Sequence, residues 1–246
     1  MFGAVWFRRG PGAAIAILLL AVVGGPLVAP ASGELRDDLL PTIQTRFVAR
    51  ATPMPMPSEG RIPVRLRLLD QISTTDGSHL PATQVIQVDL DRQFGVHLAR
   101  VESCPSGLHY DIRTPEDPCA KVKFGTGTIT FEVAFPEQQP VSVVGRAIAF
   151  KQGPGKVTIR AYLPAPIVGQ IAIPITVGRK AEGRYGIKLT AAVPKIAGGS
   201  GSVTSLDMRF RKGIFSVACP EGRFQSRVTN SFADGSVVGA GVITTC

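Results

Sequence analysis

The chain has 246 residues, of which 44% are hydrophobic and 18% are charged, and its formal net charge is +9 at pH 7. This length is sufficient for one or two domains with a sizeable core. Lys and Arg are scattered in runs of no more than two, without interleaved aromatic residues, and this pattern argues against a nucleic-acid-binding protein.

An export signal is predicted over residues 1–31. Arg8 and Arg9 form a basic start, residues 12–23 form an apolar segment, and Ala29-Pro30-Ala31 is a small-residue cleavage site. A Gly-Gly-Pro sequence ends the apolar segment before it reaches the roughly 20 residues of a membrane-spanning helix. The alternative is that this segment is kept as an N-terminal anchor. After its removal we expect a protein without a stable membrane span, secreted or held at the cell envelope, with a net charge of +7.

The mature chain is expected to begin with an extended leader or linker over residues 32–60, since residues 51–60 contain three prolines. A β-domain is expected over residues 61–246. Short segments there alternate apolar and polar residues, which is typical of half-buried strands. We expect strands at residues 62–70, 85–91, 96–101, 121–135, 141–151, 156–163, 170–177, 184–193, 203–211, 214–219, 224–232 and 237–243.

No crossover helices are predicted between these strands, so a parallel α/β fold is disfavoured. Residues 152–155 and Asp234-Gly235 are typical hairpin turns. The sequence therefore predicts an all-β, antiparallel β-sandwich, immunoglobulin-like or jelly-roll-like, of about ten strands. Pro174 places the strand at 170–177 at a sheet edge or a bulge, and an edge is where a partner segment can add a strand.

Four cysteines are present, an even number that in an exported chain indicates disulfides. We predict the two pairings that are local in sequence, Cys104 with Cys119 and Cys219 with Cys246. Zinc binding is disfavoured, because neither pair has Cys-x-x-Cys spacing and no histidine lies near the second pair.

Asp89 and Asp91 lie two residues apart on a predicted strand, so both carboxylates leave the same face. They are the candidates for a calcium site. The simpler interpretation is a solvated strand face balanced by Arg92 and Arg100. The alternative function is a secreted hydrolase or polysaccharide-active enzyme. Its site would consist of Asp89, Asp91, Glu102 and His109.

No further catalytic constellation is recognised, and no cofactor is expected. The loop Gly198-Gly199-Ser200-Gly201 lacks the last glycine of a nucleophile elbow and the Lys-Ser/Thr ending of a phosphate loop. Trp6 lies in the export signal, so the mature chain has no tryptophan for a sugar-binding platform.

Several segments between Val85 and Cys246 occur together: VDLDRQFGVHLARVESCP, AIAFKQG, VTIRAYLPAPI, GIKLTAAVPKIAGGSGSVTSLDMRF and FSVACPEGRFQSRVTNSFADGS. They resemble an uncharacterised family of exported all-β proteins from high-GC Gram-positive bacteria. The most specific parts are IAGGSGSVTS and the two C-terminal cysteines. The resemblance implies export and an all-β fold, and it transfers no site because no activity or ligand is associated with that family.

The expected function is a non-catalytic structural or interaction module at the cell envelope or outside the cell. Its basic charge suits an anionic cell-wall polymer, and another envelope protein is the second partner class.

Overall fold

The computed structural model describes residues 42–104, 118–135, 139–180 and 183–246, all within one compact unit that spans residues 39–246. The predicted export signal, residues 32–41 of the predicted leader and His109 lie outside the described residues.

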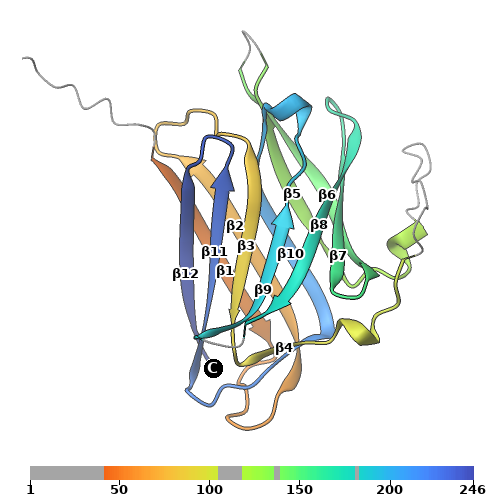
Figure 1. Ribbon diagram of the computed structural model, residues 1–246, viewed down its shortest axis with the longest axis vertical. Helices are drawn as coiled ribbons and strands as arrows, with labels where there is room; N and C mark the ends of the chain where they lie inside the picture. Colours follow the sequence, from red (N-terminus) through yellow and green to blue (C-terminus); the bar gives the residue numbers. More distant parts are fainter. Residues whose placement is uncertain (1–41, 105–117, 136–138, 181–182) are drawn as a thin grey trace, which may run out of the picture. The chain divides into compact units, whose positions relative to one another are not determined.

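Twelve strands form one hydrogen-bonded sheet in which every strand-to-strand ladder is antiparallel (Figure 1). The order is β1-β2-β10-β5-β6-β7-β8-β9-β3-β11-β12, and β4 pairs with β10 off this path. The expected all-β, antiparallel architecture is confirmed. A sandwich is not confirmed, because the ladder runs unbroken from β1 to β12. The strands are β1 (Ile43–Thr52), β2 (Ile62–Thr74), β3 (Thr83–Asp91), β4 (Phe94–Val96), β5 (Gly125–Val133), β6 (Val141–Gly153), β7 (Lys156–Leu163), β8 (Gly169–Arg179), β9 (Tyr185–Ala192), β10 (Gly201–Val217), β11 (Arg223–Phe232) and β12 (Val237–Thr245).

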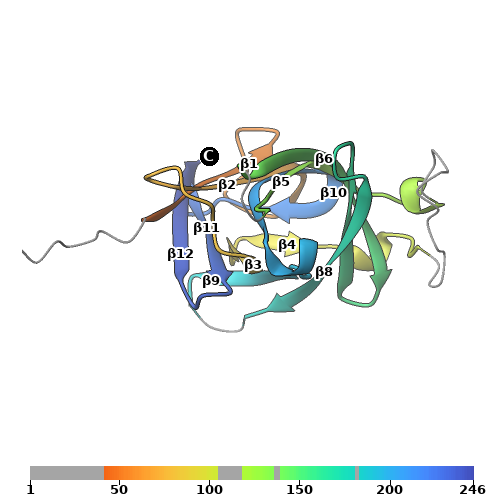
Figure 2. The same cartoon turned by 90° about the horizontal axis from the view of Figure 1, so that it is seen from above.

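The sheet curls until its two end strands, β1 and β12, lie next to each other (Figure 2). These strands share no backbone ladder, but the Thr244 hydroxyl donates to the Ala49 carbonyl oxygen over 3.3 Å. The described unit is therefore a nearly closed, barrel-like sheet with an inner and an outer face.

The inner face holds the core. In β5, Ile129, Phe131 and Val133 are buried, while the alternate residues Thr128 and Thr130 point outward, as a period of two requires. Between the walls lies an apolar cavity of about 50 Å³. This is small beside the roughly 150 Å³ of an engineered cavity that binds benzene.

The sheet begins earlier in the chain than predicted. Residues 43–52, expected to belong to the leader, form β1 and pair with β2 over their whole length. Phe47, Ala49 and Ala51 alternate inward there, and burial of this apolar face fixes the strand. The proline-containing residues 53–60 that follow form no helix or strand, and Met56 among them is buried against the core.

Three predicted strands differ in detail. The strand expected at 96–101 is instead β4 followed by a short 3₁₀ helix, Leu98–Arg100. The strands expected at 203–211 and 214–219 are one strand, β10, whose ladder with β2 shifts register between Phe210 and Phe215. This shift contains Gly213, whose φ of 94° is a conformation that glycine adopts without strain.

Strand β8 is not an edge strand as a whole, since it pairs with both β7 and β9. Its ladder with β9 nevertheless starts at Ile175, the residue after Pro174. Proline has no N–H to donate, so its presence fits the end of the ladder at this position.

Both predicted disulfides are confirmed. Cys104 is bonded to Cys119 and Cys219 to Cys246, with Cα–Cα distances of 5.3 and 6.4 Å. Within the described ranges, no helix has the length and apolarity needed to cross a membrane.

Candidate functional site: a basic groove beside strand β4

The two aspartates predicted to share a strand face do so, but the face is not solvated. Asp89 is 1% exposed and Asp91 is fully buried. Strand β3 lies between β9 and β11, and long cationic side chains from the neighbouring segments cover its outer face. The predicted balance by Arg92 and Arg100 is therefore wrong, because other cations bind these carboxylates.

Asp89 accepts hydrogen bonds from Arg227 Nε at 2.8 Å and Gln87 Nε2 at 2.9 Å, and its second oxygen lies 3.1 Å from Lys180 Nζ. Burial raises the pKa of Asp89, but the hydrogen bonds from Arg227, Lys180 and Gln87 outweigh burial and hold the pKa below its ordinary value. The Arg227 guanidinium also lies over the Tyr185 ring, 4.6 Å from its centroid. Asp89 thus anchors a set of cations.

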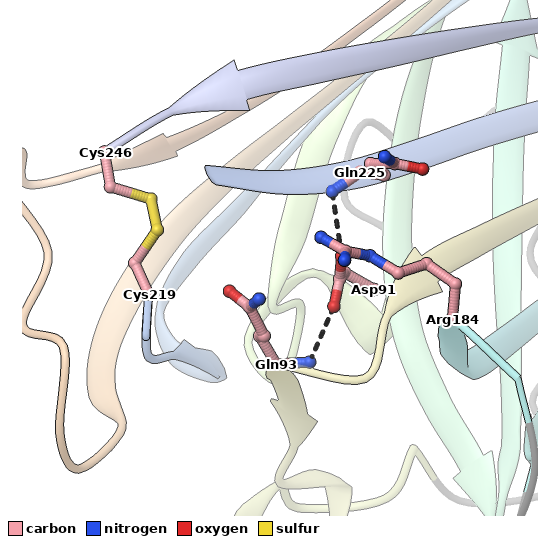
Figure 3. The surroundings of a disulfide bond; sticks show 6 residues. All are labelled: Asp91, Gln93, Arg184, Cys219, Gln225 and Cys246. Carbon is pink, nitrogen blue, oxygen red and sulfur yellow. Dashed lines mark hydrogen bonds and ion pairs between the residues drawn. A yellow bond between two sulfur atoms is a disulfide. The ribbon is translucent and has the colours of Figure 1, made fainter. Parts of the chain in front are cut away.

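Asp91 holds together the end of the sheet beside the second disulfide (Figure 3). Its carboxylate accepts hydrogen bonds from the backbone N–H groups of Gln93 at 3.1 Å and Gln225 at 3.0 Å. Arg184 Nε donates to the same carboxylate over 2.6 Å, and Arg184 Nη1 donates to Glu221 over 2.5 Å. This carboxylate therefore orients three segments of the chain.

Calcium binding by Asp89 and Asp91 stays a prediction. In this structure protein donors engage both carboxylates. Across the described residues, no three His, Cys, Asp or Glu side chains gather as metal ligands would. Glu102, the third member of the proposed hydrolase site, is exposed. Of its fourth member, His109, the described ranges show nothing.

The other two histidines have partners that limit their chemistry. His79 Nδ1 lies 2.6 Å from Glu132 Oε1, and its Nε2 lies 3.0 Å from the Ser200 carbonyl oxygen. Both ring nitrogens thus face acceptors, and neither is free to act on a substrate. His97 Nε2 lies 2.8 Å from the hydroxyl of Ser216, which is buried on β10.

A groove runs beside β4 and the 3₁₀ helix that follows it. It consists of two adjoining hollows, of about 260 and 360 Å³, which share Val96, His97 and Arg179 in their walls. The end of β8, Arg92 directly after β3, and the start of β9 complete the walls. We call this feature the basic groove, because its walls carry Arg61, Arg92, Arg100, Arg179 and Lys180.

The local packing brings these cations to the groove. Gly186 has no side chain, and a Cβ there would lie 2.7 Å from the Cα of Arg92, so the turn at Arg92 packs directly on the start of β9. Arg61 donates from Nε to the Gln93 carbonyl oxygen and from Nη2 to that of Arg92, each over 2.9 Å. These bonds orient the guanidinium without neutralising it.

The electrostatics of the groove are one-sided. No Asp or Glu is among the described residues of either hollow. Lys180 is paired with Asp89 behind the wall. Arg100 and Arg179 have no ion pair or side-chain hydrogen bond with any described residue. A phosphate or carboxylate placed here would accept charge-assisted hydrogen bonds from guanidinium groups, which present several donors in a fixed fork.

Sequence reasoning did not find this site. Its five cations come from four places in the chain between residues 61 and 180, and the adjacent Arg179 and Lys180 are the longest basic run among them. A basic net charge was the one available signal. Of the predicted site residues that the structure describes, Asp89 is the one connected to the groove, through Lys180.

No protein-family model, curated protein or solved structure matches this chain.

Proposed function

We propose that this protein is an exported, non-catalytic interaction module that holds an anionic group of a cell-envelope component in the basic groove. The observation that carries this proposal is a concave surface with five cationic side chains and no carboxylate in its described walls. The partner class that fits this charge is an anionic cell-wall polymer, and an acidic envelope protein is the second.

Two further observations support the setting. Two disulfides suit an oxidising compartment, as expected for a chain that begins with a predicted export signal. Among the described residues of the groove, the one Phe, Tyr or Trp is Phe94, and it is buried. Recognition would therefore depend on charge and hydrogen bonds rather than on stacking of sugar rings.

A hydrolase is less well supported than a binding module. Ser216 and His97 resemble a nucleophile and its base, but the Ser216 side chain does not line either hollow. A working pair of this kind also needs a third group that orients the histidine, and no carboxylate lines the described walls around His97.

The test is retention of the purified protein on cell-wall and glycan fractions in rising salt. The variant Arg100→Gln/Arg179→Gln removes two groove cations that pair with no described acid, so it leaves no carboxylate unpaired. The matched control Lys123→Gln/Lys195→Gln removes the same charge from exposed positions outside the groove.

We expect the groove variant to be released at lower salt than the wild-type protein and the control to behave like the wild type. Equal loss of retention in both variants would show that the groove contributes only non-specific charge attraction. Such attraction is screened within about 10 Å at 0.1 M salt. Failure of every fraction to retain the wild-type protein would contradict the proposal.

A further inference from the structure

A second concentration of positive charge lies on the outer face of β1, β2 and β10, which are neighbours in the sheet (Figure 1). The register places Arg50 directly opposite Arg67, and Arg67 directly opposite Arg209, so three arginines form one row across three strands. We call the six arginines on this surface the arginine face: Arg46, Arg50, Arg65, Arg67, Arg209 and Arg211.

Acidic residues hardly compensate this charge. Among all residues of β1, β2 and β10, the acids are Asp70, which points into the core, and Asp207. Asp207 is held by Arg67 through two hydrogen bonds of 2.9 and 2.7 Å, and Arg209 lies 3.9 Å away from it. The remaining arginines, Arg46, Arg50, Arg65 and Arg211, make no ion pair with any described residue.

Folding stability favours only part of this arrangement, because Asp207 forms ion pairs with Arg67 and Arg209 but none with Arg50. Like charges directly opposite each other on neighbouring strands are destabilising, and both cross-strand pairs in the row are arginine pairs. Exposed strand positions accept threonine readily, as Thr126 does beside Arg209 on β5. An external anion would convert the repulsion into attraction.

The spacing of the charges favours an extended ligand. Strands lie about 4.8 Å apart and residues two apart on a strand lie about 6.7 Å apart. The arginines thus form a two-dimensional array on the outside of a sheet, where one small anion reaches only a few of them. A linear polymer that carries an anionic group on each unit can contact the array along its length.

The chemistry of the face favours a polymer over a bilayer. Its apolar members, Val48 and Leu69, are half-buried between the arginines. The exposed large hydrophobic residues of the described chain all lie on other segments, whereas peripheral membrane binding usually adds apolar insertion to basic charge. Exposed hydroxyls of Thr126 and Thr128 on β5 border the face and add donors for phosphate oxygens.

We propose that the arginine face is a second binding surface, distinct from the basic groove, that docks the protein on a linear phosphate polymer. The two surfaces share no residue, so an experiment can contradict one proposal without affecting the other.

The experiment measures binding of long-chain inorganic polyphosphate and of tripolyphosphate by calorimetry over a series of salt concentrations. We expect the long chain to bind much more tightly than tripolyphosphate. We also expect Arg50→Gln/Arg209→Gln to reduce the slope of log K against log salt by about two, one for each lost contact. The charge-conserving Arg50→Lys/Arg209→Lys should keep the slope.

The variant Lys195→Gln/Arg223→Gln has the same net charge as the face variant, changes exposed residues outside both surfaces and is the matched control. An equal loss of slope in both would show dependence on net charge alone and would overturn the inference. Tighter binding to phosphatidylglycerol-containing vesicles, or to polygalacturonate of similar length, than to polyphosphate would contradict the phosphate polymer as ligand. The melting temperature of Arg50→Gln/Arg209→Gln should be unchanged or higher, and a lower one would mean that these arginines serve the fold.

Discussion

Asn230 and Asp70 are separated by 160 residues, yet Asn230 Nδ2 donates a hydrogen bond of 2.9 Å to Asp70 Oδ2 inside the curled sheet. Thr45 Oγ1 donates to the other carboxylate oxygen over 2.7 Å. Asp70 is 4% exposed and Asn230 is fully buried. Burial raises the pKa of Asp70, and the hydrogen bonds from Thr45 and Asn230 offset this only in part.

This buried carboxylate makes stability depend on pH. The folded protein binds the Asp70 proton more tightly than the unfolded chain does, in which the carboxyl has its ordinary pKa of 3.8. The free energy of unfolding therefore falls as pH rises from that value through the raised folded pKa. Asp70→Asn should remove this dependence and raise the free energy of unfolding at pH 7 by about 1 kcal/mol.

The asparagine has a further advantage, since Asn230 Oδ1 has no hydrogen-bond partner among the described residues and a new amide can donate to it. Urea denaturation at pH 5 and pH 7.5 measures the effect. Asp70→Ala is the control and should be destabilising, because it leaves Thr45 and Asn230 without their acceptor. A less stable Asp70→Asn at pH 7.5 would contradict this account.

The Asp91–Arg184 ion pair should be far more important for stability than the Arg184–Glu221 pair. Replacing Arg184 with Met leaves the fully buried Asp91 without its cation, and an unpaired buried charge is strongly destabilising. Glu221→Gln breaks a pair whose acid is 51% exposed and should change stability by no more than about 0.5 kcal/mol. Guanidinium unfolding of the two variants provides the comparison, and similar losses would mean that Asp91 is not isolated from water.

The disulfide between Cys219 and Cys246 closes 27 residues and fixes the end of the chain beside Asp91 (Figure 3). In the chain-entropy model, replacing both cysteines with serine should lower the free energy of unfolding by about 3.5 kcal/mol. The pair at Cys104 and Cys119 closes 15 residues, for which the expected loss is about 3 kcal/mol. Urea unfolding of both double variants checks the order, and a negligible loss at Cys219 and Cys246 would show that other contacts secure this end.

Gly127 should tolerate no side chain, although it lies within a strand. A Cβ at this position would overlap the backbone oxygen of Asp207 on β10. Gly127→Ala must displace the ladder between β5 and β10, and we expect a loss of about 3 kcal/mol, at the upper end of overpacking effects. Gly169→Ala on β8 is the matched control, because its Cβ would have no atom within 4 Å. Thermal unfolding that ranks the two variants equally would contradict the close approach.

The strand positions and the cystine pairs could be predicted because their signals are local. Alternation within β5 and the short separation of each cysteine pair depend on nearby residues only. The same local rule put Asp89 and Asp91 correctly on one face. It could not show that this face is covered, because the cations that cover it come from residues 180, 184 and 227.

The sequence alone therefore determined the class of structure, the inward or outward direction of most strand residues and the cystine links. The neighbours of each outward residue were decided only by the tertiary structure. Arg50, Arg67 and Arg209 are scattered along the chain, and the pairing register of three strands places them in one row. A strand's own sequence fixes the face of each side chain, whereas the register between strands depends on packing of the whole core.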